Sequence, residues 1–476
     1  MTRHSPTVFD RTTWPDSLLD SALAPSRPAV PWIEDLGARA ERPRLRSAMR
    51  TDLVIVGGGL TGLWTAVRAK RRDPGRRVVL LEAKRIGWAA SGRNGGFCDA
   101  SLTHGAENGR SRWPEEFETL ERLGLENLAG FERDLEELTV DAEFERVGGL
   151  DVATEEHQLE WLDDMANEPG RHRVTALGAR ALVDSPTYLG GVVTSGDSLA
   201  LVHPGKLSEG LARAAEELGV EIFEHSPATG LDADGDRMVV RTAQGSVTAE
   251  RVALATNAFP SLLVRDRLMT VPVYDYVLMT EPLTAAQRES IGWLGRQGLG
   301  DVANQFHYYR LTRDHRILFG GYDAVYFAGG RIRESYEDRP ASFRKLASHF
   351  FTTFPQLEEV RFAHRWAGPI DTSTRFCAYV RLARAGRVAA ALGFTGLGVG
   401  ASRFAAEVML DRLDGLQTER TETRMMRELP PPFPPEPIAS MGIQATRWSL
   451  DQADHRGGRR NLLLRTLDAL GLGFDS

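Results

Sequence analysis

Cysteine is scarce in this chain of 476 residues, which contains only Cys98 and Cys377. Two lone thiols cannot form a CxxC metal site or a disulfide framework, and they are typical of proteins in a reducing compartment. We therefore expect a cytoplasmic protein in which both thiols are free and buried.

Long apolar runs and an excess of positive charge are also missing. No run approaches the ~18 apolar residues that a membrane span requires, and the first residues lack the apolar stretch of a secretory signal. The 58 basic residues are outnumbered by 65 acidic residues, which gives a formal net charge of −7. We therefore expect neither a membrane nor a nucleic acid as the main partner.

The composition is that of a folded globular protein. Hydrophobic residues make up 42% of the chain and charged residues 26%, which is enough apolar material for a large core. The length favours about three domain-sized units. Apolar alternation predicts strands at residues 220–223, 238–242, 246–247 and 251–255, and a helix over residues 206–218.

A glycine-rich turn lies between two apolar runs near the N-terminus. Residues 52–56 read as a buried strand, a helical pattern follows, and residues 77–81 complete a βαβ unit. The turn reads Gly57-x-Gly59-x-x-Gly62. Gly57 permits the tight turn, Gly59 leaves room for phosphates, and Gly62 lets the helix lie on the strand. Because a helix N-terminus favours negative charge, this turn predicts a dinucleotide site.

An acidic residue, Glu82, ends the second strand of this unit. At this spacing a carboxylate accepts hydrogen bonds from ribose hydroxyls and repels a 2′-phosphate. The position therefore disfavours NADP but leaves both NAD and FAD open.

Three later segments favour FAD. Residues 87–96 are rich in Gly, Ala and Ser, whereas NAD enzymes usually continue with another crossover at this point. Such small residues allow the chain to pass under a flat flavin ring. Residues 252–258 end a strand in small and polar side chains. Residues 392–400 form a second strand–glycine–helix turn, whose helix dipole can face the electron-rich end of a flavin.

These motifs, in this order, resemble the D-amino-acid-oxidase/glycine-oxidase (DAO) superfamily, and within it the gamma-glutamylputrescine oxidoreductase-like branch. Residues 203–207, 255–257 and 316–321 add to the resemblance, which covers about residues 30–415. It implies an α/β fold with a Rossmann-like FAD-binding domain and an interleaved α+β substrate domain built on a mostly antiparallel sheet. We expect an N-terminal arm (1–50), a discontinuous FAD-binding domain (51–140, 196–270 and 365–415), a substrate domain (141–195 and 271–364), and a Pro-rich linker with a helical tail (416–476).

The resemblance also implies which residues hold the cofactor. Members of the superfamily often carry a His where this chain has Leu397. Some members bind flavin covalently through a His or Cys, and this chain has no evident counterpart, although Cys98 lies close to the glycine-rich segment at residues 87–96. We therefore expect non-covalent FAD. The implied contacts are Gly57, Gly59, Leu60, Thr61 and Gly62 at the pyrophosphate, Glu82 and Ala83 at the ribose, Ala90, Ser91, Arg93, Asn94, Gly95 and Gly96 along the flavin, Thr256 and Asn257, and Thr395, Gly396 and Gly398 at the pyrimidine end.

The reaction implied by the resemblance is oxidation of a C–N bond in a small amine. Hydride passes to flavin N5, the resulting imine hydrolyses, and O2 or another acceptor reoxidises the flavin. Such a step needs positioning more than a dedicated base. We therefore assign no catalytic triad, and the scattered histidines predict no metal site.

Substrate contacts are expected on an aromatic-rich sheet. Asn304, Phe306, Tyr308 and Arg310 alternate on one face of an expected strand, and the remaining candidates, on nearby segments, are Tyr276 and Tyr322, with Arg365 and Trp366 as weaker ones. Aromatic walls can exclude water and accept an ammonium or alkyl group.

The position at which amino-acid oxidases of the superfamily place a carboxylate-binding Arg falls on Thr312. This favours an amine or an N-substituted amino acid over an α-amino acid.

Two other functions remain open. The same fold could oxidise a C–OH substrate. Alternatively, the chain could be a flavin-binding subunit whose Pro-rich linker and amphipathic segment at residues 462–470 dock a partner. The sequence leaves the oligomeric state open.

Overall fold

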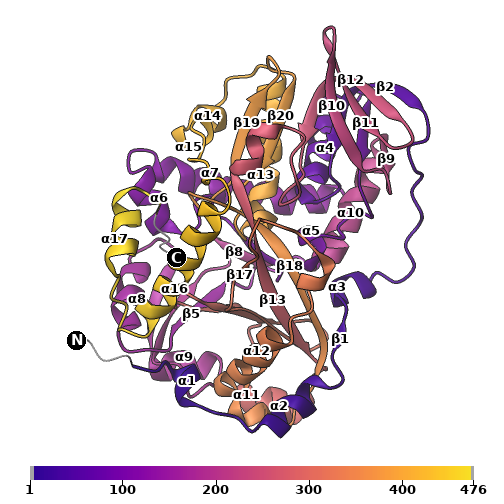
Figure 1. The fold of residues 1–476 in the computed structure, drawn as a ribbon. Coiled ribbons are helices and arrows are strands. Elements are labelled where there is room, and N and C mark those ends of the chain that lie inside the picture. The colour runs from indigo at the N-terminus through magenta and orange to yellow at the C-terminus, as the bar shows by residue number, and fades with distance from the viewer. Residues whose placement is uncertain (1–4, 473–476) are drawn as a thin grey trace.

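The computed structural model describes residues 5–472 and is built on two large β-sheets. The smaller sheet lies at the top of Figure 1, with the larger sheet below it. Segments from distant parts of the chain alternate between the two sheets. Within residues 5–472, no helix is both long and apolar enough to cross a membrane.

The first sheet has eight strands in the order β10-β11-β12-β2-β3-β9, with β20 pairing with both β12 and β19. Its centre is parallel, and alternate side chains of β2 enter different cores: Leu53 and Ile55 on one face, Val54 and Val56 on the other. Both faces are therefore buried, as the continuous apolar run predicted. The strands are β2 (Ala48–Val56), β3 (Val78–Leu81), β9 (Val220–Phe223), β10 (Ala228–Asp234), β11 (Arg237–Thr242), β12 (Ser246–Leu254), β19 (Tyr379–Ala383) and β20 (Val388–Leu392).

Helices cover one face of this sheet and share a core with it. They are α4 (Leu60–Arg72), α7 (Phe117–Glu137), α10 (Pro204–Glu217) and α13 (Gly398–Leu413). Helices α4 and α13 contact each other closely. Because each follows a central parallel strand, their N-termini lie at the same edge of the sheet.

The second sheet has ten strands in the order β1-β18-β13-β16-β15-β14-β5-β7-β6, with β17 paired to β13. All its neighbours are antiparallel except β1–β18 and β14–β5. The strands are β1 (Arg27–Pro28), β5 (Gly149–Ala153), β6 (Arg171–Thr175), β7 (Gly190–Thr194), β13 (Thr270–Thr280), β14 (Gly298–Asp301), β15 (His307–Leu311), β16 (Ile317–Gly321), β17 (Val325–Tyr326) and β18 (Phe362–Ser373).

One face of the second sheet packs on α12 (Pro340–Thr353) through a core rich in aromatic rings, including Tyr274, Phe319 and Phe350. The opposite face is turned toward the first sheet. Strand β18 pairs with β13 along its whole length. Residues 365–373, which we expected in the FAD-binding domain, therefore belong to this sheet by hydrogen bonding.

From residue 5 on, the N-terminal arm predicted at residues 1–50 packs against the rest of the protein. It contains three helices and strand β1, and Trp32 is buried with its indole N–H donating to the Asn94 carbonyl (3.0 Å). The arm helices are α1 (Val8–Arg11), α2 (Asp16–Leu23) and α3 (Pro31–Glu34).

Short α-helices elsewhere are α5 (Ala90–Arg93), α6 (Ala106–Arg112), α8 (Gln158–Ala166), α9 (Ala176–Leu182) and α11 (Ala285–Ile291). Strands β4 (Phe97–Asp99) and β8 (Leu199–Leu201) form a separate two-stranded antiparallel sheet, and the 3-10 turns are η1 (Val264–Leu268), η2 (Glu334–Tyr336) and η3 (Pro355–Leu357).

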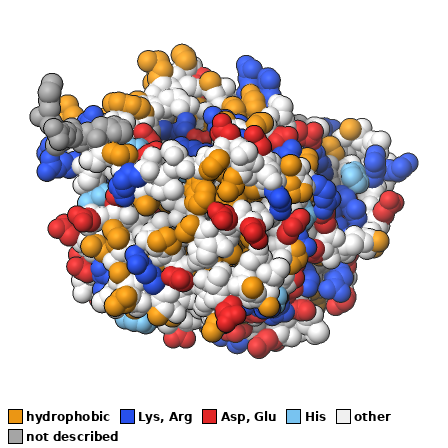
Figure 2. Space-filling model, turned by 90° about the horizontal axis from the view of Figure 1, so that it is seen from below, with side chains coloured by type: hydrophobic (Ala, Val, Ile, Leu, Met, Phe, Trp, Pro, Cys, Tyr) orange, Lys and Arg blue, Asp and Glu red, His pale blue; other side chains and the backbone are white. Residues whose placement is uncertain are grey.

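The C-terminal tail forms α14 (Glu419–Glu422), α15 (Arg424–Arg427), α16 (Ile438–Asp454) and α17 (Leu462–Ala469). Helix α17 confirms the amphipathic segment predicted at residues 462–470. The last two helices, yellow in Figure 1, lie beside α6 and α8 at the left of the molecule. The underside, drawn in Figure 2, mixes acidic and basic side chains with small apolar patches.

Candidate functional site

A cavity of about 920 Å³ lies between the two sheets. Its walls are the N-termini of α4 and α13, residues 90–95, one face of the ten-stranded sheet, and the C-terminal tail. This volume is at the upper end of the range for small-molecule and cofactor sites.

The glycine turn joins β2 to α4 at one wall of the cavity. Gly57 has a φ of +111°, and a Cβ there would lie 2.3 Å from the Ala255 carbonyl oxygen. A Cβ on Gly62 would lie 1.9 Å from the Gly57 oxygen. Leu60 and Thr61 line the cavity, and the Leu60 N–H donates to Ser91 Oγ (2.9 Å). The backbone is therefore packed as closely as only glycine permits, which brings a helix N-terminus suited to a pyrophosphate to the cavity.

Glu82 follows β3 and points back to the glycine turn. Its Oε2 accepts the Gly58 N–H (2.7 Å), while Oε1 accepts the Lys84 N–H (2.7 Å) and the Trp88 indole N–H (2.8 Å). Burial raises the pKa of this carboxyl, and these hydrogen bonds oppose the shift. The neighbouring Ala83 is exposed. The turn and the acidic residue that the sequence paired are thus in direct contact.

Residues 90–96 form a glycine-rich wall that is held by its own polar side chains. Asn94 Nδ2 donates to the carbonyls of Ala90 (2.9 Å) and Ser91 (3.0 Å), and its Oδ1 accepts the Gly96 N–H (2.8 Å). Arg93 donates to the Trp88 carbonyl (2.7 Å) and is ion-paired with Glu337. A Cβ on Gly95 would lie 2.8 Å from the Tyr308 ring. Arg93 and Asn94 therefore shape this wall.

The wall at α13 is organised by Asp371, which sequence reasoning missed. Its carboxylate accepts the N–H groups of Gly393 (2.5 Å) and Phe394 (3.2 Å) and the Asn257 side-chain amide (3.0 Å). Burial raises the pKa of Asp371 to about 7. Asp371 lies in β18, and the residues around it in the sequence do not indicate whether its side chain is buried or exposed to solvent.

The turn before α13 presents backbone to the cavity. Thr395, Gly396 and Gly398 all line it, and Gly396 has a φ of +92° with no heavy atom within 4 Å of an added Cβ. Asn257 also lines the cavity, whereas Thr256 does not, and its buried Oγ1 has no hydrogen-bond partner in the structure. Two helix N-termini therefore face one cavity, an arrangement that fits an elongated anionic cofactor such as FAD.

Of the six candidate substrate contacts on this sheet and its neighbouring segments, Asn304, Phe306, Tyr308 and Tyr322 line the cavity. Tyr276 does not, because it lies on the opposite face of β13, fully buried against Phe343, and its hydroxyl donates to the Tyr336 carbonyl (2.7 Å). The side chains of β13 that reach the cavity are the alternate ones, among them Asp275 and Val277. The prediction that Tyr276 faces the substrate was wrong, because side chains alternate along β13 and the adjacent residues are the ones that face the cavity.

Arg310 is also absent from the cavity wall. Its guanidinium donates to the carbonyls of Val202 (2.6 Å), Gly95 (3.3 Å) and Gly96 (3.4 Å). A buried cation needs such acceptors, and burial lowers the pKa of Arg310 to about 10. Arg310 therefore supports the glycine-rich wall from behind. Asn304 and Phe306 precede β15 and do not extend its alternation.

Asp275 is an acidic group in direct contact with the aromatic wall. The Tyr308 hydroxyl donates to one carboxylate oxygen, and the Gly321 N–H donates to the other (3.2 Å). Burial raises the pKa of Asp275 to about 6. Trp366 lines the cavity beside it and donates to the Arg93 carbonyl (2.8 Å), whereas Arg365 is ion-paired with Asp338.

The C-terminal tail closes the remaining side of the cavity. Residues from the Pro-rich linker, α16 and α17 line it, among them Phe433, Ile443, Leu450, Leu463 and Leu467. The sequence pattern marked α17 as amphipathic, but it did not indicate which surface the apolar side chains cover.

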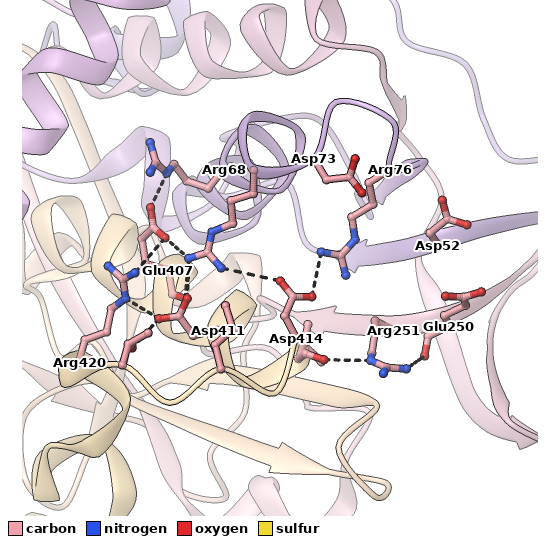
Figure 3. A pocket seen from close by; sticks show the side chains of 14 residues that line it. Asp52, Arg68, Asp73, Arg76, Glu250, Arg251, Glu407, Asp411, Asp414 and Arg420 are labelled. Carbon is pink, nitrogen blue, oxygen red and sulfur yellow. Dashed lines mark hydrogen bonds and ion pairs between the residues drawn. The ribbon is translucent and has the colours of Figure 1, made fainter.

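A second cavity, of about 830 Å³, lies among charged side chains of α4 and α13 (Figure 3). Its charges are paired with one another: Arg72 with Asp411 (2.8 Å), Arg76 with Asp414 (3.2 Å), and Arg420 with Asp411 (2.6 Å). This network joins the helices and leaves the first cavity as the candidate site. Within the described part of the chain, no group of three His, Cys, Asp or Glu side chains is placed to hold a metal. Cys98 and Cys377 are free and buried, as expected.

Comparison with known proteins places the chain in a family. The family described as FAD dependent oxidoreductase (DAO) matches residues 52–412. Gamma-glutamylputrescine oxidoreductase of Escherichia coli is 31% identical over 384 residues, which cover 78% of this chain and 85% of the relative. A probable oxidoreductase, OrdL, of Haemophilus influenzae is 28% identical, with 78% and 85% covered.

A solved structure gives the same result for the fold. Glycine oxidase from Geobacillus kaustophilus superposes with a TM-score of 0.64 at 20% identity, over 78% of this chain and 96% of that one. The predicted α/β fold with a Rossmann-like FAD-binding domain is thereby confirmed. The chain belongs to the FAD dependent oxidoreductase (DAO) family and is an FAD-dependent amine or amino-acid oxidoreductase.

Proposed function

We propose that this enzyme oxidises the C–N bond of a small amine or an N-substituted amino acid, with FAD held non-covalently. The observation that carries the proposal is the state of the arginines that line the cavity. Arg93 is paired with Glu337, Arg171 with Glu168, and Arg447 with Asp323. A free carboxylate of an α-amino acid would therefore have to displace an existing ion pair.

The cavity walls indicate how FAD would lie. The glycine turn and the N-terminus of α4 would hold the pyrophosphate, and Glu82 with Ala83 would lie at the ribose. Cys98 is buried in the apolar core, which supports a non-covalent link. The residues proposed to contact the flavin and its pyrimidine end are Ala90, Ser91, Arg93, Asn94, Gly95, Gly96, Thr256, Asn257, Thr395, Gly396 and Gly398.

When bound, FAD would supply the electron acceptor, taking hydride at N5 from the carbon next to the amine nitrogen so that an imine forms and hydrolyses. The chain's own groups would prepare the amine. An alkyl ammonium has an ordinary pKa near ~10.4, so it arrives charged and must lose a proton to expose its lone pair. Asp275, hydrogen-bonded to Tyr308, would hold the ammonium against the aromatic wall and accept the proton that it releases.

Phe306, Tyr308 and Tyr322 are the proposed substrate contacts. Their rings would exclude water from the imine-forming step and accept the alkyl part of the amine. The Escherichia coli relative is named for gamma-glutamylputrescine, which supports an amine as the substrate class.

The test is anaerobic titration of the purified, FAD-loaded protein with amines, amino acids and alcohols while the visible flavin absorbance is recorded. We expect bleaching by alkyl amines or N-alkyl amino acids. Bleaching by alcohols alone would replace the C–N reaction with a C–OH reaction. Oxygen uptake, compared with reduction of an artificial acceptor, then identifies the physiological type of acceptor.

A further inference from the structure

The far end of the main cavity is built around an acidic side chain on a bare sheet surface. Past Tyr308, across β14, the sheet exposes the backbone of Gly149, Gly298 and Gly300 to the cavity. Asp151 on β5 rises from this floor, and a Cβ on Gly300 would lie 3.3 Å from its Oδ1. Glycines at these positions leave space beside the carboxylate.

Two polar groups at this end have no hydrogen-bond partner. Among residues 5–472, the Asp151 carboxylate forms no hydrogen bond and no close ion pair, and the cation that acts on it is Arg171. Thr194, which pairs with Gly149 in the sheet, lines the cavity with 6% of its surface exposed, and its Oγ1 has no hydrogen-bond partner. Buried polar groups are almost always hydrogen-bonded, and an unpaired one costs free energy. A ligand that bonds to both would remove that cost.

The surrounding charges favour a cation. Glu168 is paired with Arg171 (3.0 Å), Asp301 accepts from His307 Nδ1 (2.6 Å), and Asp99 accepts the Ser101 N–H (2.6 Å). These acids therefore each hold a close donor, whereas Asp151 has none and feels only the longer-range attraction of Arg171. Burial raises the pKa of Asp151 to about 6, and the nearby Arg171 opposes this shift.

We propose that Asp151 and Thr194 form a subsite for a second cationic group of the substrate, so that the enzyme prefers amines that carry another ammonium at the far end of an alkyl chain. This inference rests on the proposed function. Asp151 neutralises the distal charge, and the Thr194 hydroxyl accepts one of its N–H groups. The subsite lies two strand spacings from Tyr308, about 10 Å, which requires several methylene groups between the two nitrogens.

The experiment compares hexamethylenediamine with hexylamine and aminohexanol, which have the same chain but no distal charge. In the FAD-loaded wild type we expect a KM for the diamine about tenfold or more below that for hexylamine. Asp151→Asn should remove this preference and leave the hexylamine KM unchanged. Thr194→Val should weaken the preference by a smaller factor. Asp197→Asn, at an exposed position after β7, is the matched control and should change neither KM.

Equal KM values for the diamine and hexylamine in the wild type would overturn the subsite, and this comparison needs no variant to fold. So would an equal rise for both amines in Asp151→Asn. Calorimetry with hexamethylenediamine separates the subsite from the proposed reaction. Binding lost in Asp151→Asn, with no amine bleaching the flavin, would keep the subsite and refute amine oxidation. Bleaching by hexylamine, with diamine binding unaltered in Asp151→Asn, would support amine oxidation and refute the subsite.

Discussion

Replacing Gly62 by Ala tests the close packing at the glycine turn against simple helix propensity. Gly62 lies in the first turn of α4, and in a helix Ala is normally more stable than Gly by about 1 kcal/mol. Here the added Cβ would lie 1.9 Å from the Gly57 oxygen and 3.3 Å from Ile55 Cγ2. A C···O contact needs roughly 3.3 Å, so α4 and the turn must separate by more than about 1 Å.

That separation cannot be relieved by rotating a side chain, because the obstacle is backbone. The Gly57 N–H is itself bonded to the Leu81 carbonyl (2.8 Å), so the turn is fixed to the sheet. Overpacking of this kind costs about 1–3 kcal/mol or more. We expect Gly62→Ala to be less stable than the wild type by about 2 kcal/mol, and to retain less FAD because the helix N-terminus moves away from the phosphates.

The control is Gly442→Ala in α16, where an added Cβ meets no heavy atom within 4 Å. It should gain up to about 1 kcal/mol from helix propensity. The assays are thermal melting and flavin absorbance per chain after desalting. If Gly62→Ala melts at or above the wild type, as Gly442→Ala should, the close-packing argument is refuted.

Three further predictions concern groups around the cavity. Arg310→Met should lower the free energy of unfolding by about 2–3 kcal/mol, because buried carbonyls lose their donor, and this should appear as a lower melting temperature and FAD content. A raised amine KM at unchanged stability would instead make Arg310 a substrate contact. Asp454→Ala removes the acceptor of the Asn304 side-chain N–H (2.6 Å) and should speed limited proteolysis within residues 430–472; equal rates would show that this contact does not anchor the tail. Burial raises the pKa of Asp371 to about 7, so the folded state binds this proton more tightly than the unfolded state. Its stabilising contribution is present below about pH 4 and lost as pH rises through about 7. FAD-free wild type should therefore lose melting temperature relative to Asp371→Asn between about pH 5 and pH 8, and parallel curves would contradict the shifted pKa.

Local patterns in the sequence were sufficient for the parts of the fold that depend on neighbouring residues. The strand predicted at residues 220–223 is β9, and the helix expected over 206–218 is α10 (Pro204–Glu217). The two short strands predicted at 246–247 and 251–255 are one strand, β12, because it pairs with β11 at its start and with β20 at its end. That continuity comes from partners that are distant in sequence.

The substrate side of the cavity was harder to predict because both faces of β13 are buried. In a strand with one wet face, polarity shows which residues point inward. In β13, Tyr276 packs on Phe343 of α12 and Tyr274 on Phe327 and Tyr336. Val273 and Asp275 face the cavity instead. Aromatic residues suggested a substrate wall, but their large apolar rings fill the helix-facing core instead. Only knowledge of where α12 lies resolves the alternation.

The tail bears on the hypothesis that the chain is a subunit, which rested on an amphipathic segment in need of a partner. In the structure, Leu463 and Leu467 of α17 line the chain's own cavity and Leu464 is buried. The Pro-rich linker is tied to the body through the Phe433 N–H and the Leu268 carbonyl (2.7 Å). The chain therefore uses part of this apolar pattern itself, while Leu462 and Leu470 stay exposed. The family match ends at residue 412, so the tail contributes to the cavity wall from outside the matched region.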